Sequence, residues 1–236
     1  MTLPELGLRY WVAISLASVF GANLGDFVAH DLHLGHWQGL FPLALVMAAI
    51  LVLQRRVPGE GCYWAGLIVV RTAATNLADL LTHDLRVGYA WVISGLAALL
   101  WLLLLAAGSR VAGGDPLRLR RRVADGRYWA AMLTAGTLGT AIGDCVADRF
   151  GLGPGGGTLV LGGIMAVVLV AGCRSNWSGR LAYWSGIVAV RSAGTTAGDY
   201  WVRAPWIDPG LPLAPACSGA VFIATLLLWR PRRIAA

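Results

Sequence analysis

Charged side chains are scarce in this sequence. Of its 236 residues, 13% are Asp, Glu, Lys or Arg, whereas 57% are hydrophobic. A soluble domain carries about 25% charged residues, so the composition excludes an ordinary soluble protein. Residues 88–107 contain no charged side chain and are long enough to cross a hydrocarbon core of about 30 Å. The sequence therefore predicts an all-α integral membrane protein.

Several familiar motifs are also missing. The four cysteines show no CxxC spacing, and no HExxH motif occurs, so neither a disulfide framework nor a zinc site is indicated. We expect no cleavable signal peptide, because the first apolar segment carries Asp26 and belongs to the repeat described below.

The net charge of +7 comes from arginines that gather in a few places, at residues 55–56, 110–127, 174–180 and 230–233. A basic chain can bind nucleic acid, but these clusters fall at every second gap between apolar segments. That spacing is typical of cytoplasmic loops. We therefore expect no nucleic-acid partner. We expect a multi-pass protein of the bacterial inner membrane, surrounded by lipid, with both termini cytoplasmic.

The dipeptide Tyr-Trp occurs four times, and sixteen residues after each tyrosine stands an aspartate. The pairs are Tyr10/Asp26, Tyr63/Asp79, Tyr128/Asp144 and Tyr183/Asp199. Small residues at GxxxG spacing precede these aspartates and would let helices approach closely. Copies two and four carry an arginine eight residues after the tyrosine, Arg71 and Arg191, where copies one and three have Ser18 and Gly136. A two-repeat unit has therefore been duplicated.

Each copy of the Tyr-Trp…Asp repeat predicts two transmembrane helices, and the second helix of each copy ends at a basic loop. The first half, residues 1–109, holds repeats 1 and 2; residues 110–127 form a basic cytoplasmic linker; residues 128–236 hold repeats 3 and 4. The eight predicted transmembrane helices lie near residues 10–30, 38–54, 63–83, 89–108, 128–148, 157–173, 183–202 and 212–229. Parallel repeats of this kind are related by a pseudo-symmetry axis along the membrane normal. The Tyr-Trp pairs are expected to form an aromatic belt at the inner interface.

This organisation resembles a bacterial membrane-protein family defined by four tandem repeats of unknown function, each of two transmembrane segments with a characteristic tryptophan. The matching residues are Trp11, Trp64, Trp129 and Trp184. The resemblance covers nearly the whole chain. It implies the architecture and no particular activity.

The strongly ionisable residues within the predicted spans lie on the odd-numbered helices. A charge at mid-bilayer costs about 2.5–3.5 kcal/mol on insertion scales, so these residues should face inward. We therefore expect odd helices inside and even helices outside. Each aspartate also heads a polar stripe of residues three or four apart, which share a helix face. The candidate site residues are Asp26, Asp79, Asp144, Asp199, Arg71, Arg191, Asn23, Asn76, Thr140 and Thr195.

Two Asp-x-x-x-His pairs, Asp26/His30 and Asp79/His83, suggest a place for a metal. Carboxylate and imidazole together suit divalent transition metals. Four aspartates less two arginines leave a formal charge of −2 within the membrane, which a divalent ion or two protons would balance. No cofactor is required by the sequence, but a divalent metal is a candidate ligand or substrate.

The leading hypothesis is a transporter or channel for a small solute, preferably a cation such as a divalent metal, or a proton-coupled process. Alternating access would rock one two-repeat half against the other. One alternative is an anion-handling transporter centred on Arg71 and Arg191, in which the aspartates orient the arginines. Another is a purely structural network, in which Asp26 or Asp144 accepts each arginine. A third is an intramembrane metalloenzyme with Asp26, His30, Asp79 and His83 as ligands, although an enzyme is the less favoured reading.

Overall fold

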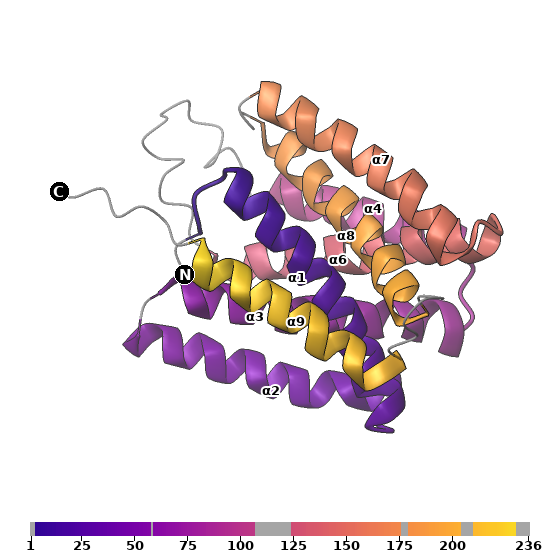
Figure 1. Ribbon diagram of the computed structural model, residues 1–236, viewed down its shortest axis with the longest axis horizontal. Helices are drawn as coiled ribbons and strands as arrows, with labels where there is room; N and C mark the ends of the chain where they lie inside the picture. Colours follow the sequence, from indigo (N-terminus) through magenta and orange to yellow (C-terminus); the bar gives the residue numbers. More distant parts are fainter. Residues whose placement is uncertain (1–2, 58, 107–123, 176–178, 204–209, 230–236) are drawn as a thin grey trace.

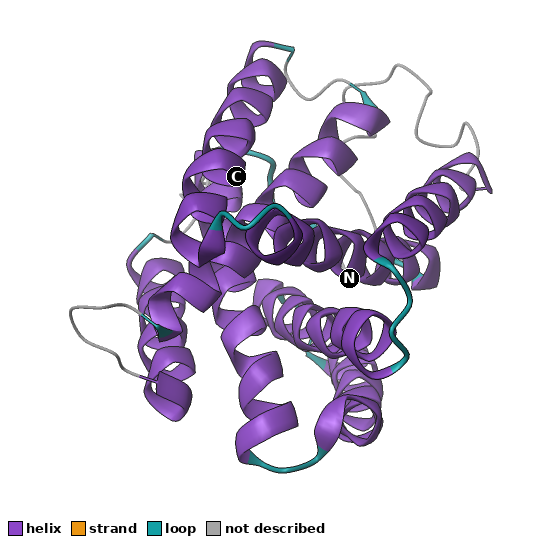
Figure 2. Cartoon of the chain, turned by 90° about the vertical axis from the view of Figure 1, so that its right-hand side faces the viewer, coloured by secondary structure: helices purple, strands orange, loops and turns teal. Residues whose placement is uncertain are grey.

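The computed structural model describes residues 3–57, 59–106, 124–175, 179–203 and 210–229. Within these ranges the chain forms eight α-helices and three π-helical segments, with no strand (Figure 2). Most of the predicted linker at residues 110–127 lies outside the described residues. The all-helical class predicted from the composition is confirmed.

Four helices form an inner ring: α1 (Leu8–Asp26), α3 (Glu60–Asp79), α6 (Gly126–Asp144) and α8 (Arg180–Val202). Both α1 and α6 pack against α3 and α8, so α1 lies opposite α6, and α3 lies opposite α8. These are the helices that begin near Tyr-Trp and carry the repeated aspartate. Their polar residues are buried in the ring, as the cost of exposing such groups to lipid requires.

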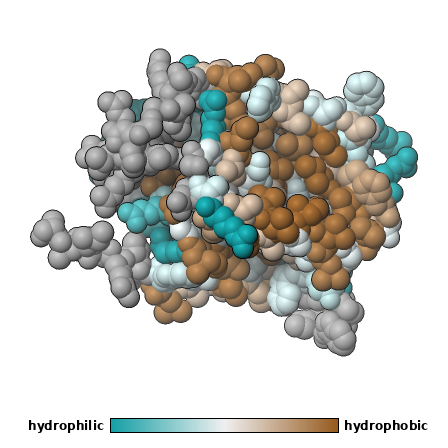
Figure 3. Space-filling model, turned by 90° about the horizontal axis from the view of Figure 1, so that it is seen from above, coloured by the Kyte–Doolittle hydropathy of each residue, from teal (hydrophilic) through white to brown (hydrophobic). Residues whose placement is uncertain are grey.

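The other four helices form an outer layer: α2 (Gly35–Arg56), α4 (Tyr89–Ala106), α7 (Gly153–Arg174) and α9 (Gly210–Leu228). Each packs against the first helix of the next copy: α2 on α3, α4 on α6, α7 on α8, and α9 back on α1 (Figure 1). Their outward side chains are apolar, with Leu159 80% exposed and Val167 70% exposed. Figure 3 shows the resulting hydrophobic surface, with hydrophilic residues near its ends.

Glycines bring the inner helices close together. A Cβ atom at Gly21 of α1 would lie 2.5 Å from Cγ of Arg71 on α3, and one at Gly25 would lie 2.8 Å from Cβ of Thr75. Gly139 and Gly143 of α6 meet Arg191 and Thr195 of α8 in the same way. The close approach predicted from the GxxxG spacing is therefore present, and a larger residue at these contacts would force a neighbouring side chain or helix to move.

Five helical stretches are long and apolar enough to span a membrane by length and composition: Leu8–Asp31, Gly35–Arg56, Tyr89–Ala106, Gly126–Arg149 and Gly153–Arg174. Among the described residues, α9 contributes a shorter apolar stretch, Leu213–Leu228. Helices α3 and α8 fall outside this group. Both carry buried polar and charged residues, which lowers their hydropathy although they lie in the inner ring.

Candidate functional site: an acidic cavity in the helix ring

Three of the four repeated aspartates mark the same change in backbone geometry. Helices α1, α3 and α6 end at Asp26, Asp79 and Asp144, and each continues directly into a π-helical turn: η1 (Phe27–Asp31), η2 (Leu80–Asp84) and η4 (Cys145–Arg149). In the fourth copy α8 continues as an α-helix past Asp199 to Val202. Such π turns occur frequently at functional sites, so the backbone independently singles out the aspartate positions.

Residues four apart along the inner helices form successive layers. The mouth layer is His30, His83, Asp148 and Arg203; next come the aspartate layer (Asp26, Asp79, Asp144, Asp199) and the threonine layer (Ala22, Thr75, Thr140, Thr195). The mouth layer is exposed, the aspartate layer is half-buried or buried, and the threonine layer is buried. Exposure to solvent therefore decreases steadily from the mouth inward.

These three layers line a single cavity of about 420 Å³, together with His36, Pro154 and Val202. All four repeated aspartates are among its lining residues. Their convergence means that the inner helices have the same polarity, with the aspartate ends together. The lining also includes Asp148 and Arg203, so five carboxylates share the cavity with one guanidinium.

The carboxylates of this cavity have few cationic partners. Within the described ranges, the ion pairs of the four repeated aspartates are limited to those of Asp79 with His36 and His83. Asp144 is the most buried of the four, at 8% exposed, and its Oδ2 accepts no hydrogen bond from the described part of the chain. Burying such a group without a partner is unfavourable, so this oxygen is available to a donor that enters the cavity.

Arg71 closes the cavity from below. Its guanidinium is fully buried and donates to the hydroxyls of the three threonines in the threonine layer: Thr75 at 3.0 Å, Thr140 at 2.6 Å and Thr195 at 2.7 Å. Its Nε donates to the backbone oxygen of Ser18 at 3.2 Å. In the part of the chain described, neither Asp26 nor Asp144 forms an ion pair with Arg71, because threonines four positions before the aspartates accept the hydrogen bonds of this guanidinium instead.

Arg191 lies deeper, on the side away from the cavity. It is also fully buried, and its Nη2 donates to Sδ of Met132 at 3.6 Å. Its Nε and Nη1 have no hydrogen-bond acceptor among the described residues. Met132 belongs to an apolar layer of fully buried side chains: Ile14, Leu67, Met132 and Ile187.

A ring of tyrosines ends the stack. The hydroxyl of Tyr10 lies 2.6 Å from that of Tyr183 and 3.1 Å from that of Tyr63, and Tyr128 is 2.7 Å from Tyr63 and 3.1 Å from Tyr183. We call these four residues the tyrosine ring. The adjacent tryptophans are buried as well and pack against neighbouring tyrosines. The Tyr-Trp pairs therefore pack inside the helix ring, at the end of the stack, instead of forming the predicted aromatic belt.

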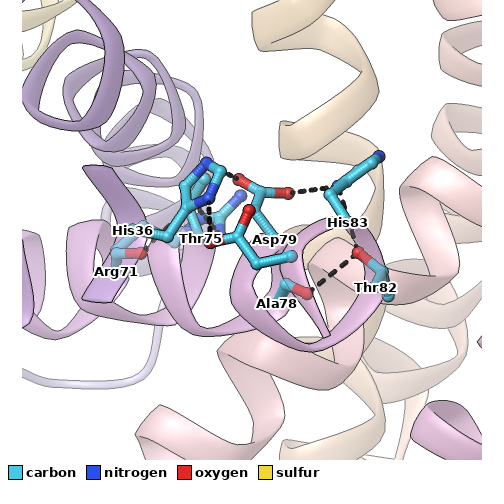
Figure 4. A network of polar contacts seen from close by, with 8 residues as sticks. His36, Arg71, Thr75, Ala78, Asp79, Thr82 and His83 are labelled. Carbon is cyan, nitrogen blue, oxygen red and sulfur yellow. Dashed lines mark hydrogen bonds and ion pairs between the residues drawn. The ribbon is translucent and has the colours of Figure 1, made fainter. Parts of the chain in front are cut away.

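Asp79 lies between two imidazoles at the mouth of the cavity (Figure 4). Its carboxylate oxygens are 3.5 Å from Nδ1 of His83 and 4.0 Å from Nε2 of His36. His36 in turn lies 2.9 Å from Oδ2 of Asp84 and stacks edge-on against His30. Even so, no group of three or more His, Cys, Asp or Glu side chains is placed to hold a metal ion in the part of the chain described.

The structure brings most of the predicted site residues together. The four aspartates, Thr140 and Thr195 line the cavity, as do the proposed metal ligands His30 and His83. Asn23 and Asn76 do not line it. Asn23 faces α9, where its Nδ2 lies 3.5 Å from Oγ of Ser218, and Asn76 lies against Gly39 of α2. An asparagine three residues before the aspartate points outward, whereas the residue four before it faces the cavity.

Four polar residues that line the cavity are not among the site residues predicted from the sequence. Thr75, Asp148 and Arg203 follow the four-residue spacing, which is the signal that identifies them. His36 gave no such signal, because it comes from the start of an outer helix and reaches the cavity only through tertiary packing.

Comparison with known families agrees with the internal repeat. The family model described as Repeat of Unknown Function (DUF347) matches residues 9–59 and 127–177, which hold α1 and α2 in one case and α6 and α7 in the other. Both matches begin the same distance before an aspartate of the cavity, Asp26 or Asp144. No curated protein and no solved structure matches the chain. The chain is therefore a protein that carries this repeat of unknown function on either side of residues 110–127.

Proposed function

We propose that the protein moves a small cation across a membrane and that the aspartate layer is its binding site. The observation that carries this proposal is the shared cavity, in which five carboxylates meet one guanidinium. Buried charges in membrane proteins are costly and mark ion or substrate paths. The unpartnered Oδ2 of Asp144 supports the same reading, because a bound cation or its water would supply the missing partner.

In this proposal all eight helices span the membrane, and the four repeats are related by an axis along the membrane normal. Arg55, Arg56, Arg127, Arg174 and Arg180 lie at the ends of helices that meet the tyrosine-ring end of the bundle. The positive-inside rule assigns that end to the cytoplasm. The cavity then opens to the outside, where an incoming cation would first meet the mouth layer.

The inner ring is closed between the threonine layer and the tyrosine ring, and this closure suggests how transport would proceed. Below the threonine layer lie Arg71, Arg191, the apolar layer and the tyrosine ring, so an ion in the cavity meets four successive barriers. This arrangement favours a transporter in an outward-open state over an open channel. Rocking of α1–α4 against α6–α9 would part the tyrosine ring and close the mouth.

A second candidate rests on Arg191, whose Nε and Nη1 lack acceptors within the described ranges. A small anion at this level would satisfy them, as an anion transporter requires. The position of the carboxylates weighs against it. An anion entering from the cavity would have to pass the aspartate layer before reaching either arginine.

The proposal is tested by thermal unfolding of the purified protein in detergent with a panel of monovalent and divalent cations. A ligand that binds only the folded state stabilises it by about 2.7 kcal/mol at a hundred times its dissociation constant. We expect such a shift for the wild type and its loss in Asp144→Asn. Glu5→Gln is the control, because this exposed acid precedes α1 at the opposite end. Stabilisation of neither protein by any cation would refute the proposal.

A further inference from the structure

The size of the cavity bears on the form in which a cation is bound. A dehydrated divalent ion needs ligand atoms about 2.0–2.6 Å away on several sides. Among the described residues, no three His, Cys, Asp or Glu side chains are placed to surround an ion in this way. As these side chains are placed, the cavity therefore offers no set of three that would replace the water shell of an ion.

The same space accommodates a hydrated ion. A shell of about six waters, at about 30 Å³ each, occupies roughly 180 Å³, and the cavity measures about 420 Å³. Waters bound to a cation present their hydrogen atoms outward and act as donors. The aspartate layer offers acceptors from all four inner helices, including the buried Oδ2 of Asp144, which lacks a donor in the described chain.

The floor of the cavity supports the same interpretation. The three threonine hydroxyls below the aspartates already accept hydrogen bonds from the guanidinium of Arg71. This fixed positive charge keeps a second cation from descending to the threonine layer, so a solute stays at the level of the carboxylates.

The lining also indicates which cations fit poorly. Its apolar members are Ala22, Pro154 and Val202, and no Phe, Tyr or Trp side chain lines the cavity among the described residues. Quaternary ammonium ions are recognised by aromatic cages, which are missing from this lining. Transition metals prefer direct nitrogen, oxygen or sulfur ligands at close range. Magnesium, by contrast, loses its waters reluctantly and is bound by few protein ligands.

We infer that the acidic cavity recognises a hydrated divalent cation of the magnesium type through its water shell, with Asp144 and the rest of the aspartate layer accepting hydrogen bonds from the coordinated waters. This inference rests on the proposed function and specifies its substrate class. It predicts outer-sphere binding, in which the ion's own ligands stay in place while the ion occupies the site.

Hexaamminecobalt(III) tests this directly, because its ammonia ligands do not exchange and it resembles a hydrated magnesium ion in size and in its outward-facing donors. We would measure binding of Mg²⁺ and of hexaamminecobalt(III) to the full-length protein in detergent by calorimetry, alone and in competition. The expected result is that both bind and compete. Asp144→Asn should weaken both by at least roughly tenfold, as loss of an outer-shell partner commonly does. Glu5→Gln should leave both unchanged.

The remaining outcomes separate this inference from the proposed function. Binding of Mg²⁺ without hexaamminecobalt(III), or of Zn²⁺ in preference to both, would overturn outer-sphere recognition and keep a cation site. Binding of a short diamine alone would overturn it in favour of an organic cation. Binding of none of these probes would overturn both proposals. If Asp144→Asn does not fold, Asp199→Asn replaces it, since Asp199 lines the same cavity from α8.

Discussion

Arg71 on α3 donates from Nη2 to the hydroxyl of Thr195 on α8, 2.7 Å away on the opposite side of the inner ring. The same guanidinium also reaches Thr140 on α6 and the backbone oxygen of Ser18 on α1. A single side chain thus contacts the other three inner helices. The charge at the centre of the bundle fastens the helices together at the floor of the cavity, and none of its hydrogen bonds goes to the aspartates above it.

Replacing Thr195 by valine should therefore destabilise the fold. The change keeps the side-chain shape and removes an acceptor from a buried charged donor, which costs about 1–3 kcal/mol. Thermal or chemical unfolding in detergent measures the loss. Thr225→Val is the matched control, because the hydroxyl of Thr225 donates within its own outer helix, to the backbone oxygen of Val221. Equal stability of the two variants would show that the Arg71 contacts contribute little.

Close packing of the inner ring predicts a different effect at Gly139. An alanine there would place its Cβ against Arg191 Cβ and 3.0 Å from the backbone nitrogen of Ser192. Overpacking of this kind costs about 1–3 kcal/mol. Gly163→Ala on α7 is the control, since a Cβ there meets nothing within 4 Å. This control should be neutral or slightly stabilising, so its unfolding temperature should exceed that of Gly139→Ala.

The tyrosine ring predicts a cost for removing one hydroxyl. In Tyr10→Phe the hydroxyls of Tyr63 and Tyr183 each lose a buried partner, which should lower the free energy of unfolding by about 1–3 kcal/mol. Tyr200→Phe removes a hydroxyl from an exposed residue of α8 and should change stability by no more than about 0.5 kcal/mol. If the two variants unfold alike, the ring does not contribute to stability.

Stabilisation by a cation should depend on pH in one direction. The cation binds the ionised carboxylates, and protons compete for the same oxygens. The stabilisation is therefore present at higher pH and is lost as pH falls toward the ordinary pKa of an aspartate, about 3.9, for instance between about pH 7 and about pH 4. Unfolding temperatures with and without Mg²⁺, measured across this range, give the sign. A shift that grows as pH falls would contradict binding at the aspartate layer.

Much of this arrangement follows from the spacing of Tyr and Asp. Equal spacing on helices of equal polarity places equivalent residues at equal depth. The sixteen residues from each tyrosine to its aspartate separate the tyrosine ring from the aspartate layer by about 24 Å along the helix axis. The sequence could therefore predict that the four aspartates converge and that the odd helices lie inside. It also predicted the inward-facing glycines, because charged and small residues share those helices.

Other features depended on geometry that the spacing does not encode. Arg71 bonds to threonines four positions along because they lie about 6 Å away along the axis, whereas an aspartate eight positions along lies about 12 Å away. Thr75 faces the cavity and Asn76 does not, because consecutive residues of a helix are rotated by about 100° around its axis. The π turns after three of the aspartates, and the arrival of His36 from α2, are products of tertiary packing.

The most direct test of the central claim is uptake of Mg²⁺ into proteoliposomes that contain the purified protein and an entrapped fluorescent indicator. The account predicts uptake by the wild type and by Glu5→Gln. It predicts a loss of at least about tenfold in Asp144→Asn, equivalent to about 1.4 kcal/mol. A wild-type rate equal to that of protein-free liposomes, or undiminished uptake by Asp144→Asn, would contradict it.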